Sequence, residues 1–88
     1  MTKLEKIIAV LENVGHNGQI YGYIELTIPG QDGTEFIVNS HKSMPNKIEY
    51  YKKTYDADGV HKFCKEIRIV SAGTMEQFYA VPDVKIYV

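Results

Sequence analysis

One cysteine and three histidines are the residues of this chain best suited to nucleophilic or metal chemistry. His61 lies three residues before Cys64, a spacing that allows a thiol–imidazole pair, whereas His16 and His41 lie far from both in the sequence. A structural zinc site needs four clustered Cys or His ligands, and a catalytic thiol needs a third group that orients its histidine. The sequence supplies neither. We therefore expect a partly buried thiol beside surface histidines, with no metal, no cofactor and no enzymatic activity.

Carboxylates occur in two patterns that resemble functional sites. Asp56-Ala57-Asp58-Gly59 matches a fragment of a calcium loop, but further oxygen ligands at alternate positions and a closing glutamate do not follow. A helix stop explains this segment better, because a helix C-terminus disfavours aspartate and a glycine can close its last turn. Three glutamates could in principle pair as acid and base, but their spacing is that of any solvated surface. They are Glu49, Glu66 and Glu76.

The segment from Ser43 to Phe63 combines tyrosines with lysines, which suits binding better than catalysis. Aromatic rings can stack on single-stranded bases while cations meet phosphates, so a weak single-stranded nucleic-acid site is one interpretation. In the other interpretation, tyrosines cover a sheet as core residues and lysines solvate the outer face of a helix. We favour the second interpretation for Tyr51 and Tyr55.

Tyr50 differs from those two tyrosines, because its helical position turns it away from the apolar side of the predicted helix. Together with Tyr21 and Tyr23, on the polar side of a predicted strand, it could belong to one exposed aromatic surface. When the net charge is near zero, such a surface marks a protein interface more often than a nucleic-acid site. We therefore expect the partner-binding residues to be Tyr50, Lys47, Lys52, Lys53 and Lys62.

A helix is predicted within this segment. Ser43 and Pro45 form a start signal, because a serine oxygen can accept a hydrogen bond from an unpaired N–H and proline is tolerated in the first turn. Asp56, Asp58 and Gly59 end the helix. Four residues recur at helical spacing and define one apolar face, which should pack on a sheet. They are Met44, Ile48, Tyr51 and Tyr55.

The rest of the chain predicts a second helix and a largely antiparallel sheet. A capping box at Thr2 and Glu5 opens a helix over residues 3–14. A period of two predicts a strand over 19–28, followed by a glycine-rich turn and a returning strand over 35–39. Later strands are expected at 66–71, 77–81 and 84–88, with a turn at 72–74. The order αββαββ, with an optional last strand, predicts one two-layer α+β domain over residues 1–88 with three to five strands.

Length, composition and charge narrow the class of protein. The chain has 88 residues, of which 44% are hydrophobic and 24% charged, as in a small globular domain. A net charge of −1 argues against strong sequence-independent nucleic-acid binding. The charge is uneven, since residues 1–40 hold two bases and five acids whereas residues 41–68 hold seven bases and four acids. One cysteine and no secretory signal or long apolar run predict a cytoplasmic protein without a membrane span.

Residues 43–58, SMPNKIEYYKKTYDAD, followed by Ile67-Arg68-Ile69, resemble small accessory proteins encoded in phages and prophages of Gram-positive bacteria. The shared pattern is K-x-x-Y-Y-x-x-x-Y-D leading into a strand; it covers less than a third of the chain and includes no catalytic motif. The resemblance implies a cytoplasmic, phage-derived protein of a class that often binds and inhibits a host protein, including defence systems. It implies neither a particular target nor any functional residue.

These observations predict a non-enzymatic binding protein that modulates or inhibits a host protein, with weak single-stranded nucleic-acid binding as the alternative. The two differ in salt response, because nucleic-acid affinity falls steeply with added salt and an aromatic protein interface responds less. A homodimer is a further expectation, since the terminal strand Val84 to Val88 could pair with the edge of a neighbouring sheet.

Overall fold

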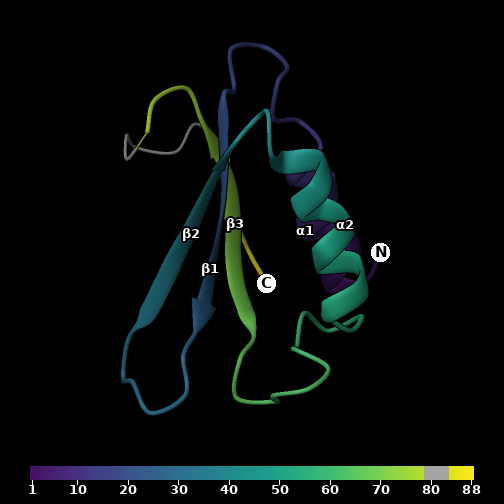
Figure 1. The fold of residues 1–88 in the computed structure, drawn as a ribbon, viewed down its shortest axis with the longest axis vertical. Helices are drawn as coiled ribbons and strands as arrows, with labels where there is room; N and C mark the ends of the chain where they lie inside the picture. Colours follow the sequence, from purple (N-terminus) through teal and green to yellow (C-terminus); the bar gives the residue numbers. More distant parts are fainter. Residues whose placement is uncertain (79–83) are drawn as a thin grey trace.

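Two helices pack on one face of a four-stranded antiparallel sheet in the computed structural model, which describes residues 1–78 and 84–88 (Figure 1). The elements in chain order are α1 (Lys3–Leu11), β1 (Tyr21–Thr27), β2 (Thr34–Ser40), α2 (Met44–Thr54), β3 (Ile69–Met75) and β4 (Val84–Tyr87). The strands lie in the order β2-β1-β3-β4, and each neighbouring pair is antiparallel. The predicted two-layer α+β fold is confirmed.

The core lies between the helices and the sheet. β1 supplies Ile24 and Leu26, α1 supplies Ile7, Ile8 and Leu11, and all five side chains are buried. The predicted alternation of β1 is therefore correct, since its apolar side faces the helices. This arrangement stabilises the fold because each element removes one apolar side from water.

Both helices begin near their predicted positions, but only one has the predicted cap. Thr2 and Glu5 form a reciprocal capping box at the start of α1, with distances of 2.9 and 3.1 Å. Pro45 lies in the first turn of α2 as predicted, whereas the Ser43 hydroxyl caps no helical N–H. It points back and donates to the carbonyl of Ser40 at 3.4 Å. The backbone of Ser43 is already in the helical region, which explains the failed prediction because an N-cap normally has extended dihedrals.

β3 begins and ends later than predicted, and the turn expected at 72–74 is wrong. Those residues lie inside the strand and are buried in the middle of the sheet. Gly73 is the direct cross-strand neighbour of Tyr23. The turn-like composition of residues 72–74 therefore lies within a paired strand, where β1 and β4 hold the backbone extended.

The C-terminal predictions have mixed outcomes. Gln77 and Phe78 lie in a bend and a turn instead of the strand expected at 77–81, and the rest of that prediction falls outside the described residues. The strand expected at 84–88 is present as β4, and it pairs with β3. One edge of β4 is therefore already paired with β3 of the same chain.

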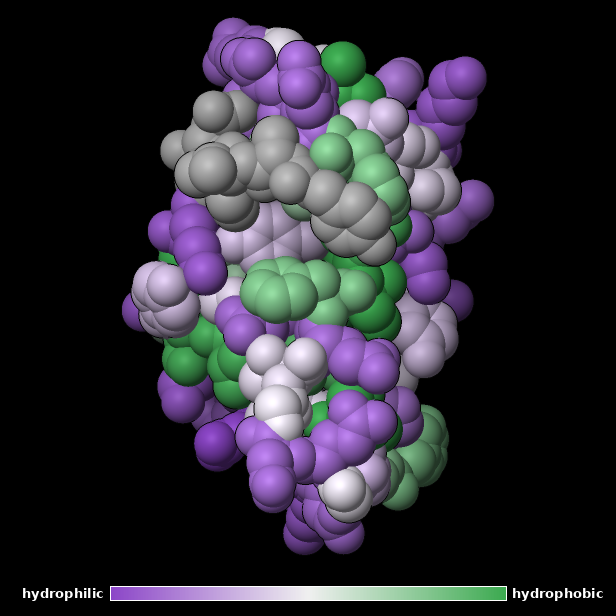
Figure 2. Space-filling view, turned by 90° about the vertical axis from the view of Figure 1, so that its left-hand side faces the viewer, coloured by the Kyte–Doolittle hydropathy of each residue, from purple (hydrophilic) through white to green (hydrophobic). Residues whose placement is uncertain are grey.

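The face of the sheet opposite the helices is covered by no described helix, and we call it the open face. Figure 2 views this side, where apolar residues gather in the middle and hydrophilic residues surround them. The Glu25 carboxylate accepts hydrogen bonds from Ser71 Oγ and Thr34 Oγ1, each at 2.6 Å, and so joins three strands. These two bonds hold the pKa of Glu25 below its usual value, the bond from Ser71 contributing most.

Candidate partner-binding surface

The side chains of α2 divide into a buried side and two flanks. Met44, Tyr51 and Tyr55 are buried and Ile48 packs against the same core, which confirms the predicted apolar face. Tyr50 lies outside that face and is 50% exposed, as predicted. α2 thus contributes core residues and exposed residues on different sides.

Lys47 and Tyr50 meet on one flank of α2. The Lys47 Nζ atom lies 5.3 Å from the centre of the Tyr50 ring, a distance at which a cation is attracted to the face of an aromatic ring. Lys53 is exposed and follows Tyr50 by three residues, so it lies on a neighbouring part of the helix surface. The structure therefore brings together three of the predicted partner-binding residues.

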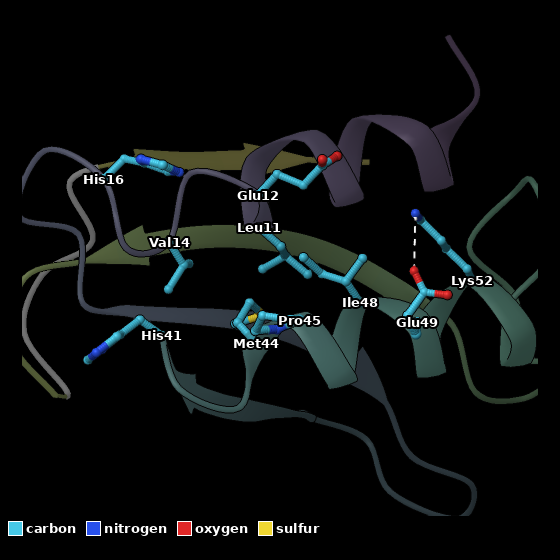
Figure 3. Close-up of a pocket in the computed structure, with 10 residues that line it drawn as sticks. All are labelled: Leu11, Glu12, Val14, His16, His41, Met44, Pro45, Ile48, Glu49 and Lys52. Carbon is cyan, nitrogen blue, oxygen red and sulfur yellow. Dashed lines mark ion pairs between the residues drawn. The ribbon is translucent and has the colours of Figure 1, made fainter.

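Lys52 lies on the other flank, facing α1. Two residues correspond to about 200° around a helix, so Lys52 and Tyr50 point in different directions. Lys52 Nζ lies 3.5 Å from Glu49 Oε1, and both side chains line a groove between the helices (Figure 3). Lys52 thus lies on a different side of α2 from Tyr50 and contributes to the groove beside α1.

This groove has a volume of about 360 Å³, an apolar floor and a polar rim. Its lining residues are Leu11, Glu12, Val14, His16, His41, Met44, Pro45, Ile48, Glu49 and Lys52. His16 and His41 lie toward one end, and the Glu49–Lys52 ion pair lies at the other (Figure 3). The two histidines are accordingly parts of the groove rim, while Cys64 lies in the chain between α2 and β3.

A series of edge-to-face ring contacts links Tyr50 to Phe63. Tyr50 contacts Tyr51 with ring centres 5.8 Å apart, and Tyr51 contacts Tyr55 at 6.0 Å. Tyr55 contacts His61 at 5.3 Å, and His61 contacts Phe63 at 6.0 Å. These separations fall within the favoured range for aromatic pairs. The buried Tyr51 and Tyr55 therefore connect two exposed aromatic positions to the core.

The turn after α2 positions the second of these aromatic positions. The Asp56 carboxylate accepts hydrogen bonds from the backbone N–H groups of Asp58 and Val60, at 2.9 and 3.0 Å. Gly59 adopts a positive φ of 77° within this turn, which suits glycine because it has no Cβ. The chain then returns to the end of α2, where the Lys62 N–H donates to the Thr54 carbonyl at 2.9 Å. Asp56 and its neighbours thus shape a separate turn; the prediction that they end the helix is wrong, because α2 already ends at Thr54 with Tyr55 in an extended conformation.

Phe63 is the residue that the sequence analysis did not single out as a contact. Its side chain is 86% exposed, and it lies next to the exposed Lys62. The available signal was an aromatic residue between Lys62 and Cys64, outside any predicted helix or strand. We define the aromatic–lysine surface as Lys47, Tyr50, Lys53, Lys62 and Phe63.

The lysines of the aromatic–lysine surface have no acidic partner in the described part of the chain. The one ion pair found there joins Lys52 to Glu49, which lie on the other flank of α2. Lys47, Lys53 and Lys62 are consequently available to acidic groups of a binding partner. Burial raises the pKa values of Tyr51 and Tyr55, the rings that connect Tyr50 to His61.

Tyr21 and Tyr23 do not extend this surface, so the expectation of one shared aromatic surface is wrong. Both belong to the opposite layer, on the open face, where Tyr21 contacts Phe78 at 5.6 Å and Tyr23 contacts Phe36 at 5.5 Å. Tyr23 is only 2% exposed, and burial raises its pKa. Successive side chains of β1 point to opposite faces of the sheet. Tyr21 and Tyr23 point to the open face, whereas α2 with Tyr50 lies on the other face.

The described residues contain no cluster of three or more side chains suited to holding a metal ion. Cys64 is a half-buried free thiol. His61 Nδ1 accepts a hydrogen bond from the Phe63 N–H at 3.1 Å, and its ring lies between Tyr55 and Phe63. These contacts place His61 within the aromatic series.

Comparison with protein-family models, curated proteins and solved structures finds no match to this chain. Neither described helix combines the length and apolar character that a bilayer crossing requires. The fold defines the chain as a small α+β protein with two helices on one face of an antiparallel sheet.

Proposed function

We propose that this chain is a non-enzymatic binding protein whose aromatic–lysine surface contacts an acidic, partly apolar patch on another protein. The observation that carries the proposal is a series of ring contacts that joins two exposed rings, Tyr50 and Phe63, through the buried Tyr51 and Tyr55 and the partly buried His61. Rings held in place before binding lose little conformational entropy on binding, and aromatic residues dominate the energetics of many interfaces.

Charge supports an acidic partner. The three lysines of the surface are not neutralised by ion pairs in the described residues, and one of them, Lys47, lies over the Tyr50 ring. Complementary charge at the rim of an interface increases association rate and specificity. The resemblance of residues 43–58 to phage accessory proteins adds the proposal that the partner is a host protein in the bacterial cytoplasm, which binding modulates or inhibits.

Affinity capture from a lysate of a Gram-positive bacterium tests the proposed surface. The double variant Tyr50→Ala/Phe63→Ala should lose a partner that the unaltered chain retains, because both exposed rings are removed. Tyr87→Ala is the matched control, since Tyr87 is also an exposed aromatic residue but lies on the open face. Loss of the same partner by the control alone would contradict the surface assignment.

Salt dependence separates protein binding from the alternative, single-stranded nucleic-acid binding through the same rings and lysines. Affinity for the purified protein partner should fall only modestly between roughly 50 and 200 mM salt. Affinity for a nucleic acid would fall steeply over the same range, because salt weakens contacts to phosphates. A steep fall for a labelled single-stranded oligonucleotide, abolished by Tyr50→Ala/Phe63→Ala, would replace the protein-binding proposal.

A further inference from the structure

β2 is an unusually unprotected edge of the sheet. It pairs with β1 on one side only, over seven residues and without a register shift. Natural edge strands are commonly protected by short length, charged side chains (above all lysine), proline or a bulge, and of these β2 has only the charge of Glu35 near its beginning. The opposite edge, β4, has four residues and contains Lys85. β2 also diverges from the helices toward its Thr34 end, which leaves that edge accessible (Figure 1).

The outward backbone groups of β2 can be identified from the hydrogen bonds around β1. The His41 N–H donates to the Ile20 carbonyl at 2.7 Å, so odd-numbered residues of β2 point their backbone groups toward β1. The Thr27 N–H instead donates toward β3, to the Arg68 carbonyl at 3.0 Å, as the same alternation requires. The N–H and C=O groups of Phe36 and Val38 therefore point away from the sheet and are free to pair with another strand.

We propose that β2 pairs antiparallel with β2 of a second copy of this chain, with the two-fold axis at Ile37. The seven residues of β2 read TEFIVNS, which is nearly palindromic in side-chain type. In this register the facing pairs are Ile37 with Ile37, Phe36 with Val38, Glu35 with Asn39, and Thr34 with Ser40. The result is one continuous eight-stranded sheet with an isologous interface.

Every facing pair in this register is chemically compatible. Phe36 faces Val38 on the open face, an aromatic–β-branched pair, and Thr34 faces Ser40, a hydroxyl pair. The one charge of the strand, Glu35, faces the neutral Asn39, so no like charges meet. Phe36 is 53% exposed in the single chain, and the second copy would cover it.

Neighbouring registers are less favourable. A slip of one residue would bring side chains from opposite faces together. A slip of two residues toward either end leaves five facing residues instead of seven, and it sets Glu35 or Asn39 opposite Ile37. The palindromic register is therefore the one that satisfies the outward backbone groups and the side chains together.

Cysteine crosslinking tests the register, in a Cys64→Ser background that removes the one native thiol. Ile37→Cys should form a disulfide-linked dimer on mild oxidation, because Ile37 faces itself across a non-hydrogen-bonded pair with Cα atoms about 4.5 Å apart. Thr34→Cys is the matched control, since position 34 lies at the end of the strand and faces position 40 of the second copy. Equal crosslinking of both variants, or of neither, would overturn the proposal.

Light scattering tests whether the β2 edge mediates dimerisation while Ile37, the residue at the two-fold axis, stays unchanged. The unaltered chain should show a mass that rises with concentration to twice that of the monomer. Phe36→Lys should remain monomeric, whereas Tyr87→Lys, the same kind of change at the β4 edge, should dimerise like the unaltered chain. Circular dichroism establishes that both variants are folded. A monomeric mass for the unaltered chain up to millimolar concentration, or a dimer lost only in Tyr87→Lys, would overturn the proposal.

Discussion

Gly22 shows at the scale of one residue how closely the helices approach the sheet. A Cβ atom at this position would lie 2.7 Å from Met44 Cε and from Val14 Cγ2, and 3.2 Å from Leu11 Cδ2. The two approaches of 2.7 Å are closer than carbon atoms pack in proteins, so the Met44 and Val14 side chains would have to shift to admit a Cβ. Glycine thus permits the close packing on the side of β1 that faces the helices.

Gly22→Ala should lower the free energy of unfolding by about 1–3 kcal/mol, the usual cost of adding a methyl group to a full core. Gly33→Ala is the matched control, because a Cβ at Gly33 would meet no atom within 4 Å. Denaturant unfolding at equal temperature measures both. An equal change in the two variants would show that the Met44 and Val14 side chains move aside without cost.

Tyr51 and Tyr55 make the protein sensitive to alkaline pH. Burial raises the pKa of each phenol above its usual value, with the greater shift at Tyr51. The unfolded chain ionises near its ordinary tyrosine pKa of about 10, while the folded chain retains these protons. The stability that the two residues contribute is thus complete below about pH 10 and is lost as the pH rises through their folded pKa values.

The free energy of unfolding should accordingly fall as the pH rises above about 10, and Tyr51→Phe should make this decline shallower. Tyr21→Phe is the control, because it removes a phenol hydroxyl from the open face and leaves the buried phenols of α2 in place; it should change the slope less than Tyr51→Phe does. Denaturant unfolding between pH 9 and pH 11, which is roughly one unit on either side of the ordinary tyrosine pKa, provides the measurement. A slope that Tyr21→Phe changes and Tyr51→Phe does not would contradict the assignment.

The sheet elements are joined on the open face by Glu25 of β1, which bonds Ser71 of β3 and Thr34 of β2. The same bonds lower the pKa of Glu25, so its contribution to stability is present above the ordinary glutamate pKa of about 4.3. It is lost as the pH falls through the lower folded value. This residue therefore couples three strands at neutral pH and less strongly in acid.

Glu25→Gln should lower the free energy of unfolding at pH 7 (a pH well above about 4.3) by about 1 kcal/mol, since an amide accepts fewer and weaker hydrogen bonds than a carboxylate. The difference in unfolding free energy between Glu25→Gln and the unaltered chain should become smaller below the ordinary glutamate pKa. Glu35→Gln, at an exposed position of β2, is the control and should have little effect at either pH. An equal loss of unfolding free energy in both variants would show that the charge of the strand, and not the two hydrogen bonds of Glu25, stabilises the fold.

At the scale of the whole molecule, the two proposed contacts use different parts of the fold. The aromatic–lysine surface belongs to α2 and the turn after it, whereas the proposed dimer uses backbone groups at the β2 edge. The basic segment 41–68 recognised in the sequence includes α2 and this turn. The acidic excess of residues 1–40 lies in the β1–β2 hairpin, which holds Glu25, Asp32 and Glu35 and no base, whereas Lys3 and Lys6 balance Glu5 and Glu12 at α1.

The periodic parts of the sequence predicted the fold well. The pattern of two over β1 and the helical pattern over α2 each identified the side that is buried, including Met44, Tyr51 and Tyr55. Prediction failed where composition resembled a turn, as at Gly73, because its role depends on Tyr23 of another strand. The cap at Ser43 failed for a similar reason, since the hydroxyl found the Ser40 carbonyl of the preceding turn.

The sequence by itself determined which residues can be exposed, because helical and strand periods decide which side chains share a face. It thereby predicted that Tyr50 and Lys47 lie outside the apolar face of a helix, where the structure brings them into contact. Tertiary structure decided which exposed residues lie together. The packing of α1 beside α2 placed Lys52 in the groove between the helices, and the turn after α2 added Phe63, because contacts between elements depend on packing that no local pattern records.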